Sequence, residues 1–159
     1  MALTVYDKVK WHIQAENTPK NMPEEKVATP IAFFLQWSYE NNFLHSDIME
    51  IIDSYLEHQA VINFKDLLLI DLDGILSSEE LSSKGKRFMN AYYRDERSKF
   101  AQAFSFYLKD YDNFIKTYYG DNYTNDLYYT YEYTPENYIK IKQIIDERYK
   151  QYLNFSDKN

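Results

Sequence analysis

Apolar residues recur every three or four positions along most of the chain, which is the pattern of amphipathic helices. The clearest example is the segment 46–58, and its apolar stripe consists of Ile48, Ile51, Ile52, Tyr55 and Leu56. The same periodicity predicts helices over 30–42, 64–72 and 135–153, and over 83–118 with a break near "RDERS". The pattern therefore indicates a mainly α fold, a helical bundle.

Local signals support these boundaries. Threonine followed by proline combines a helix N-cap with a residue whose fixed φ suits the first helical turn, and the chain has this pair at Thr29-Pro30 and Thr134-Pro135. The segments Asn63–Asp66 and Ser77–Glu80 have the spacing of a capping box. Gly120 follows the long periodic stretch and is expected to end it.

Two parts of the chain lack helical periodicity. Residues 1–29 contain two prolines, with a third directly after them at position 30, and are predicted to form an irregular arm. The segment 123–133, "YTNDLYYTYEY", alternates with period two and is a possible strand. Residues 3–7 are the other short strand candidate, so we expect a small β-ribbon between the two. The chain of 159 residues is expected to form a single domain, with helices over 30–118 and a C-terminal helix over 135–153.

The tyrosine-rich segment 123–133 is open to two interpretations. As a strand it would direct Tyr129, Tyr131 and Tyr133 into the core. The opposite face, with Tyr123, Tyr128 and Glu132, would then be exposed and could bind a partner. A register change of one residue would exchange the two faces. Tyrosine favours interfaces because it combines a large apolar area with a hydrogen-bonding group.

Composition narrows the chemistry. The chain has no cysteine, which excludes disulfides and thiolate metal sites, and only 3 glycines, which leaves little material for a phosphate-binding loop. Charges at positions 7, 8 and 10 interrupt the first residues, and no apolar run approaches membrane-spanning length. We therefore expect a cytoplasmic protein with no membrane contact.

Charge is distributed unevenly within the net −7. Residues 40–80 carry ten Asp and Glu and one Lys, whereas 81–108 carry six Lys and Arg and two acids. The basic segment 84–99 could touch nucleic acid, but neutralising the acidic region within the fold is the simpler interpretation. A net-acidic chain is repelled by phosphates and attracts basic partners, so we expect no nucleic-acid partner.

Candidate chemistry is sparse. The three histidines, His12, His45 and His58, lie in separate predicted elements and are interpreted as structural or surface residues. Asp71 and Asp73 in "DLDG" resemble a metal-binding pair, but a turn at the end of a helix explains them more simply. We therefore predict no metal, no cofactor and no catalytic residue.

The acidic residues offer a better functional candidate. On the helix 46–58, Asp47, Glu50, Asp53 and Glu57 fall outside the apolar stripe and form an acidic ridge. Such a ridge is either a solvated face or a surface that steers a basic partner. The predicted partner-binding residues are the four acids of this ridge together with Asp71, Asp73, Tyr123, Tyr128 and Glu132.

Several segments resemble an uncharacterised bacterial family of small acidic proteins. They are "YDKVKWH" at 6–12, "MPEEKVATPIAFFLQW" at 22–37, the middle from "FKDLLLIDLDG", and "TPENYIKIKQIIDERY" near the end. The most specific part is the start, with Tyr6, Asp7, Lys8, Trp11 and His12. The sequence departs from the family pattern at Pro30, where the family often has His, and at Ala32, where it often has Gly.

The resemblance implies an immunity protein, because genes of this kind resemble those beside polymorphic toxins, including toxins of type VI secretion. Such a protein binds a cognate secreted toxin and occludes its active site, for example the active site of a nuclease toxin. Two alternatives stay open. One is a small hydrolase or metal-dependent enzyme that uses His12 with Asp7 and Trp11 in a pocket under the proline-rich arm. The other is a structural adaptor or homo-oligomer, and the sequence is compatible with a monomer or a homodimer.

Overall fold

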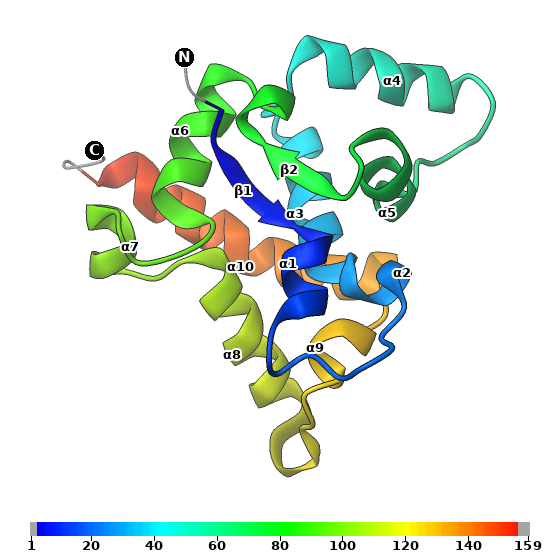
Figure 1. The fold of residues 1–159 in the computed structure, drawn as a ribbon. Coiled ribbons are helices and arrows are strands. Elements are labelled where there is room, and N and C mark those ends of the chain that lie inside the picture. Colours follow the sequence, from blue (N-terminus) through cyan, green and yellow to red (C-terminus); the bar gives the residue numbers. More distant parts are fainter. Residues whose placement is uncertain (1–2, 156–159) are drawn as a thin grey trace.

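The computed structural model describes residues 3–155 and is mainly α-helical, with one small antiparallel ribbon (Figure 1). In chain order the elements are β1 (Val5–Lys8), α1 (Val9–Gln14), α2 (Glu24–Val27), α3 (Thr29–Glu40), α4 (Ser46–Leu56), α5 (Phe64–Asp66), the π-helix η1 (Leu67–Asp71), β2 (Ile75–Ser77), the 3₁₀ helix η2 (Ser78–Glu80), α6 (Ser83–Tyr92), α7 (Lys99–Ala103), α8 (Tyr107–Tyr119), the 3₁₀ helix η3 (Gly120–Asn122), α9 (Leu127–Thr130) and α10 (Pro135–Asn154).

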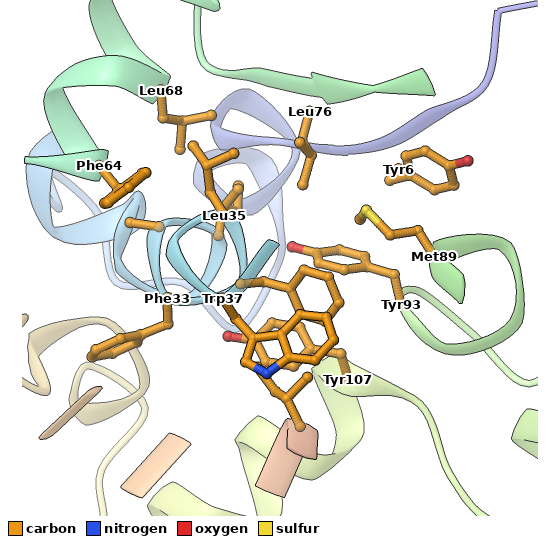
Figure 2. Packing of buried hydrophobic residues seen from close by; sticks show 14 of the residues in the cluster. Tyr6, Phe33, Leu35, Trp37, Phe64, Leu68, Leu76, Met89, Tyr93 and Tyr107 are labelled. Atoms are coloured by element: carbon orange, nitrogen blue, oxygen red, sulfur yellow. The ribbon is translucent and has the colours of Figure 1, made fainter. Parts of the chain in front are cut away.

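Helix α3 is the centre of the fold. Its sequence "TPIAFFLQWSYE" is apolar on nearly every side, and a helix of that kind must be surrounded by protein. Phe33, Phe34, Leu35 and Trp37 are fully buried, and the ribbon, α5, α6, α8 and α10 supply their neighbours (Figure 2). The core is therefore built around one helix rather than between two layers.

Tyrosine hydroxyls at the edge of this core fix the helices that surround α3. Tyr107 on α8 donates to the backbone oxygen of Pro30, and Tyr138 on α10 donates to Glu40 at 2.6 Å. Trp37 adds a bond from its indole nitrogen to Asp146 on α10 at 2.8 Å. Because a phenol buries a ring and satisfies a polar tip at the same site, the many tyrosines serve packing first.

Most predicted helix boundaries are confirmed. The side chain of Thr134 accepts from the amide of Asn137 at 3.1 Å, and Asn63 accepts from Lys65 at 2.9 Å. Ser77 and Glu80 form a reciprocal capping box. The expected break in 83–118 is present, although it divides the stretch into three helices, and Gly120 ends α8 with φ of +57°.

The predicted cap at Thr29 is wrong. Helix α3 begins at Thr29 itself, with Ala28 as its N-cap in helical conformation, because α2 leads almost directly into α3. The Thr29 hydroxyl is buried and makes no hydrogen bond with the described residues. An N-cap residue needs an extended backbone, and the residues before Thr29 are already helical. Thr29 therefore cannot act as an N-cap.

The predicted strand at 123–133 is also wrong, and so is the partner assigned to residues 3–7. Strand β1 pairs with β2, through Val5 with Ser77 and Lys8 with Ile75. Residues 127–130 form the short helix α9, which directs the rings of both Tyr128 and Tyr129 against the protein. In a strand these two neighbours would point to opposite faces, so packing overrode the local alternation.

The capping carboxylate Glu80 gives a pH-dependent prediction. Glu80 accepts from the Ser77 amide at 2.8 Å, and burial raises the pKa of Glu80 above its ordinary value. A raised carboxyl pKa means that the folded state binds the proton more tightly, so this group's contribution to stability falls as pH rises through that range. Glu80→Gln keeps an acceptor for Ser77 and removes the charge.

We therefore expect Glu80→Gln to gain stability relative to the wild type as pH rises from about 4 to about 7. Urea unfolding of both proteins at the two pH values measures the difference. Glu79→Gln, an exposed neighbour in the same turn, is the control and should show little of this pH-dependent gain. A growing deficit of Glu80→Gln at the higher pH would show that the charge itself stabilises the turn.

Candidate functional site

The predicted pair Asp7 and His12 forms a real contact. Asp7 is a buried residue near the end of β1, and His12 lies one turn into α1. The change from strand to helix between them brings the two side chains together. The His12 Nε2 atom lies 2.9 Å from the Asp7 carboxylate, and its Nδ1 atom lies 2.8 Å from the hydroxyl of Tyr129 on α9. Tyr93 donates to the same carboxylate at 2.8 Å.

Hydrogen bonding determines the proton positions in this network. A carboxylate only accepts, so Nε2 of His12 carries the proton that faces Asp7. In the neutral ring Nδ1 is then the acceptor, and the Tyr129 hydroxyl donates to it. Asp7 also accepts from the amide of Lys8 at 2.9 Å. The result is a connected chain from Tyr129 through His12 to a buried carboxylate.

The chain of hydrogen bonds limits the chemistry that His12 can perform. Both ring nitrogens are bonded to protein groups, so neither is available to a metal or a substrate in this conformation. Burial raises the pKa of Tyr129 to about 12, which is opposite to the shift of an activated nucleophile. The geometry therefore fits a clamp between the N-terminal arm and α9 better than a catalytic centre.

Trp11 does not join His12 and Asp7, in contrast to the predicted pocket. Its ring is 37% exposed and carries two cations, with the Arg94 guanidinium carbon at 4.8 Å from the ring centre and the Lys8 amine at 5.5 Å. Tyr6 is buried on the other side of β1 and donates to Asn90 at 2.7 Å. The motif Tyr6 to His12 thus spreads over three different environments.

The acidic ridge on α4 is exposed as predicted. Asp47, Glu50, Asp53 and Glu57 are all exposed, while Ile48 and Ile52 are buried beneath them. Among the described residues the only basic side chain close to a ridge carboxylate is that of His45, whose Nδ1 atom lies 3.6 Å from Asp47 and accepts from the Asp47 amide at 3.1 Å. The other three carboxylates face solvent along a helix at the upper edge of the molecule (Figure 1).

Asp71 extends this acidic surface across a groove. The groove has a volume of about 560 Å³, and its lining includes Asp47, Glu50, Ile51, Tyr55 and Asp71. The Tyr55 hydroxyl donates to Asp71 at 2.6 Å, and this bond raises the pKa of Tyr55. We call the ridge together with Asp71 the α4 acidic surface. Asp71 is the last residue of the π-helix η1, an uncommon element that often marks functional positions.

The remaining predicted contact residues lie elsewhere. Asp73 has φ of +53° and lines a separate small depression with Lys10 and Glu24. Tyr123 and Tyr128 are half-buried at the other end of the molecule, and Glu132 is exposed nearby in sequence. Of the tyrosines predicted to point inward, Tyr129 and Tyr131 are buried and Tyr133 is half-buried. The predicted residues therefore do not form one continuous surface.

Sequence reasoning missed several members of the clamp. Tyr93 and Tyr129 complete the Asp7–His12 network from positions 86 and 117 residues away from their partners. No local pattern marks these two among seventeen tyrosines. Arg94 was counted within a basic segment, and its stacking on Trp11 could not be foreseen. Within residues 3–155 no cluster of three or more His, Cys, Asp or Glu side chains is arranged to hold a metal ion.

A comparison with protein families identifies the family of this chain. The model of a family described as a domain of unknown function (DUF7832) matches residues 5–151. The chain belongs to this family. The DUF7832 match spans the clamp, the α4 acidic surface and most of α10. No curated protein and no solved structure matched the chain. No helix within the described part of this DUF7832 chain is both long and apolar enough to cross a membrane.

Proposed function

We propose that this protein is an immunity protein, a stoichiometric inhibitor that binds a cognate secreted toxin through the α4 acidic surface. The observation that carries the proposal is the exposed, largely unpaired row of carboxylates on α4. Like charges three or four residues apart on a helix repel one another and lower helix stability. Asp47 lies in the first turn of α4, where an acid favours the helix, but Glu50, Asp53 and Glu57 have no such position, and a basic partner would relieve their repulsion.

The groove beside the ridge supplies what a charged surface alone lacks. Ile51 and Tyr55 add apolar and aromatic area between the carboxylates of Glu50 and Asp71. Charged groups raise association rates and select partners, whereas buried aromatic anchors hold a complex together. A toxin with a basic active-site cleft, such as a nuclease, has the complementary charge.

The hydrolase alternative rests on the Asp7–His12 contact. It is weaker for two reasons. The hydroxyl of Tyr129 occupies the second His12 nitrogen, and the groove that Tyr129 and Thr18 line does not include His12 among its lining residues. An enzyme of this design would have to break the Tyr129 bond before His12 could accept a proton from a substrate.

The first test is co-expression of the tagged protein with the product of the adjacent gene. A one-to-one complex whose partner kills cells when expressed alone would support immunity. Elution of the protein alone, with a harmless neighbour, would overturn it. The surface is then tested with the triple variant Glu50→Lys, Asp53→Lys and Glu57→Lys.

We expect the triple variant to weaken binding roughly tenfold or more at moderate salt and to lose protection of the host. The matched control reverses three exposed acids on other elements, Glu16→Lys, Glu96→Lys and Glu147→Lys, and changes net charge by the same amount. Equal protection by both variants would show that the α4 acidic surface is not the binding site.

A further inference from the structure

A second groove lies at the opposite end of the molecule from α4. It has a volume of about 530 Å³ and opens between arm residues 15–18, helix α8 and the segment 123–129. In Figure 1 the chain after α1 meets α8 and α9 at the lower end, where these segments converge. The volume falls within the range of sites for small molecules, roughly 300–1,000 Å³. We call this cavity the arm groove.

The charge of the arm groove is opposite to that of the whole chain. Arg94, Lys109 and Lys116 contribute to its lining, and Asp112 is the acid among the lining residues. Asp112 is neutralised by Lys116, whose amine lies 2.9 Å from its carboxylate. Within the described residues Arg94 and Lys109 have no carboxylate partner. Two uncompensated cations thus face one cavity in a protein of net charge −7.

The backbone places the two residues that carry these cations next to each other. The amide of Leu108 donates to the carbonyl of Tyr93 at 3.2 Å, which joins the start of α8 to the end of α6. Arg94 and Lys109 are the next residues of the two joined segments. Stacking of the Arg94 guanidinium on Trp11 at 4.8 Å further fixes its orientation.

Aromatic rings form the other side of the arm groove. Tyr123, Tyr128 and Tyr129 line it, and the rings of Tyr128 and Tyr129 meet edge to face with centres 4.7 Å apart. Asn17 and Asn125 add amide groups that donate and accept. Aromatic walls with a few convergent polar groups are typical of ligand sites.

We propose that the arm groove binds a small planar aromatic molecule that carries an anionic group, a phosphate or a carboxylate. The anion lies against Arg94 and Lys109, where a planar guanidinium and an ammonium donate charge-assisted hydrogen bonds. The ring lies against Tyr123 and Tyr128. This site goes beyond the proposed immunity function, since it shares no lining residue with the α4 acidic surface.

Titrations followed by amide chemical shifts test the site, with phenyl phosphate and phenylacetate as the aromatic anions. Methyl phosphate carries an anion without a ring, and benzyl alcohol carries a ring without an anion. We expect the aromatic anions to shift the amides of Asn17 and Asn125 and to bind roughly tenfold more tightly than either partial probe. The tighter of the two aromatic anions identifies the anionic group.

The variant Arg94→Gln with Lys109→Gln should weaken aromatic-anion binding roughly tenfold or more. The control Arg87→Gln with Lys150→Gln removes the same two charge types from exposed positions on α6 and α10 and should bind normally. All four side chains are exposed, and circular dichroism confirms folding. No shift with either aromatic anion, equal binding of methyl phosphate, or equal weakening by both variants would overturn the proposal.

The two proposals fail separately. The triple lysine variant on α4 should retain phenyl phosphate binding, because none of its positions lines the arm groove. The Arg94→Gln, Lys109→Gln variant should retain toxin protection. Loss of phenyl phosphate binding in the α4 variant, with the fold intact, would contradict the independence of the two sites.

Discussion

Replacing Asp110 with alanine is expected to lower the free energy of unfolding by about 3 kcal/mol, because the change leaves a charge and a hydroxyl without their partner. Asp110 is buried on α8 and accepts two bonds from the Arg148 guanidinium on α10, at 2.9 and 3.1 Å. Tyr92 on α6 donates to it at 2.6 Å, so one carboxylate joins three helices.

Asp112 provides a matched control for this prediction. It lies on the same helix two positions later and pairs with Lys116 at 2.9 Å, but the lysine is 54% exposed. A surface pair of this kind contributes about 0.3–0.5 kcal/mol, so Asp112→Ala should change stability little. Urea unfolding compares the two variants, and equal losses would show that the buried triad contributes no more than a surface pair.

A combined variant separates charge from packing. Asp110→Leu, Arg148→Met and Tyr92→Phe together remove every polar member of the triad and keep apolar volume. We expect this protein to regain most of the stability that Asp110→Ala loses, because no unpaired polar group remains. If the combined variant is as unstable as the single one, the loss comes from the missing attraction within the triad itself and not from polar groups left without a partner.

Features that depend on nearby residues could be predicted from the sequence. The cap at Thr134 and the box at Ser77–Glu80 each join residues three positions apart, and both are present. The stripe on α4 repeats every three or four positions, and Ile48 and Ile52 are buried as expected, whereas Leu56 at its end is exposed. The pairing of β1 with β2 joins segments about seventy positions apart, which local patterns do not encode. The tyrosine run misled the strand assignment for the same reason, since α2, α3 and α8 pack against α9 and determine its conformation.

In the candidate sites, too, contacts between nearby residues could be predicted and contacts between remote segments could not. The acids of α4 could be placed on one face because helical periodicity fixes their spacing. Their approach to Asp71 depends on the path of the chain through 57–66 and was not predictable. Asp7 and His12 are five positions apart and were foreseen as a pair, whereas Tyr129 and the cations of the arm groove come from remote segments.

Replacing Asp7 with alanine is expected to cost about 3 kcal/mol of unfolding free energy, because three donors lose a buried acceptor. The Asp7 side chain is 4% exposed and accepts from the Lys8 amide, His12 and the Tyr93 hydroxyl. Asp7→Asn keeps the shape and one acceptor oxygen, so it should cost about 1–2 kcal/mol. Glu16→Ala, at an exposed acid in the same arm, is the control and should be nearly neutral.

The outcome at Asp7 also distinguishes the clamp from a catalytic dyad. Groups placed for catalysis often reduce stability, so their removal commonly leaves a protein equally stable or more stable. A clamp has the opposite signature, because Asp7 satisfies donors from β1, α1 and the end of α6. A large loss in Asp7→Ala, with an intermediate loss in Asp7→Asn, would assign the network to holding the arm on the helices. Unchanged or increased stability in Asp7→Ala would instead favour the hydrolase alternative and make His12 the residue to test for activity.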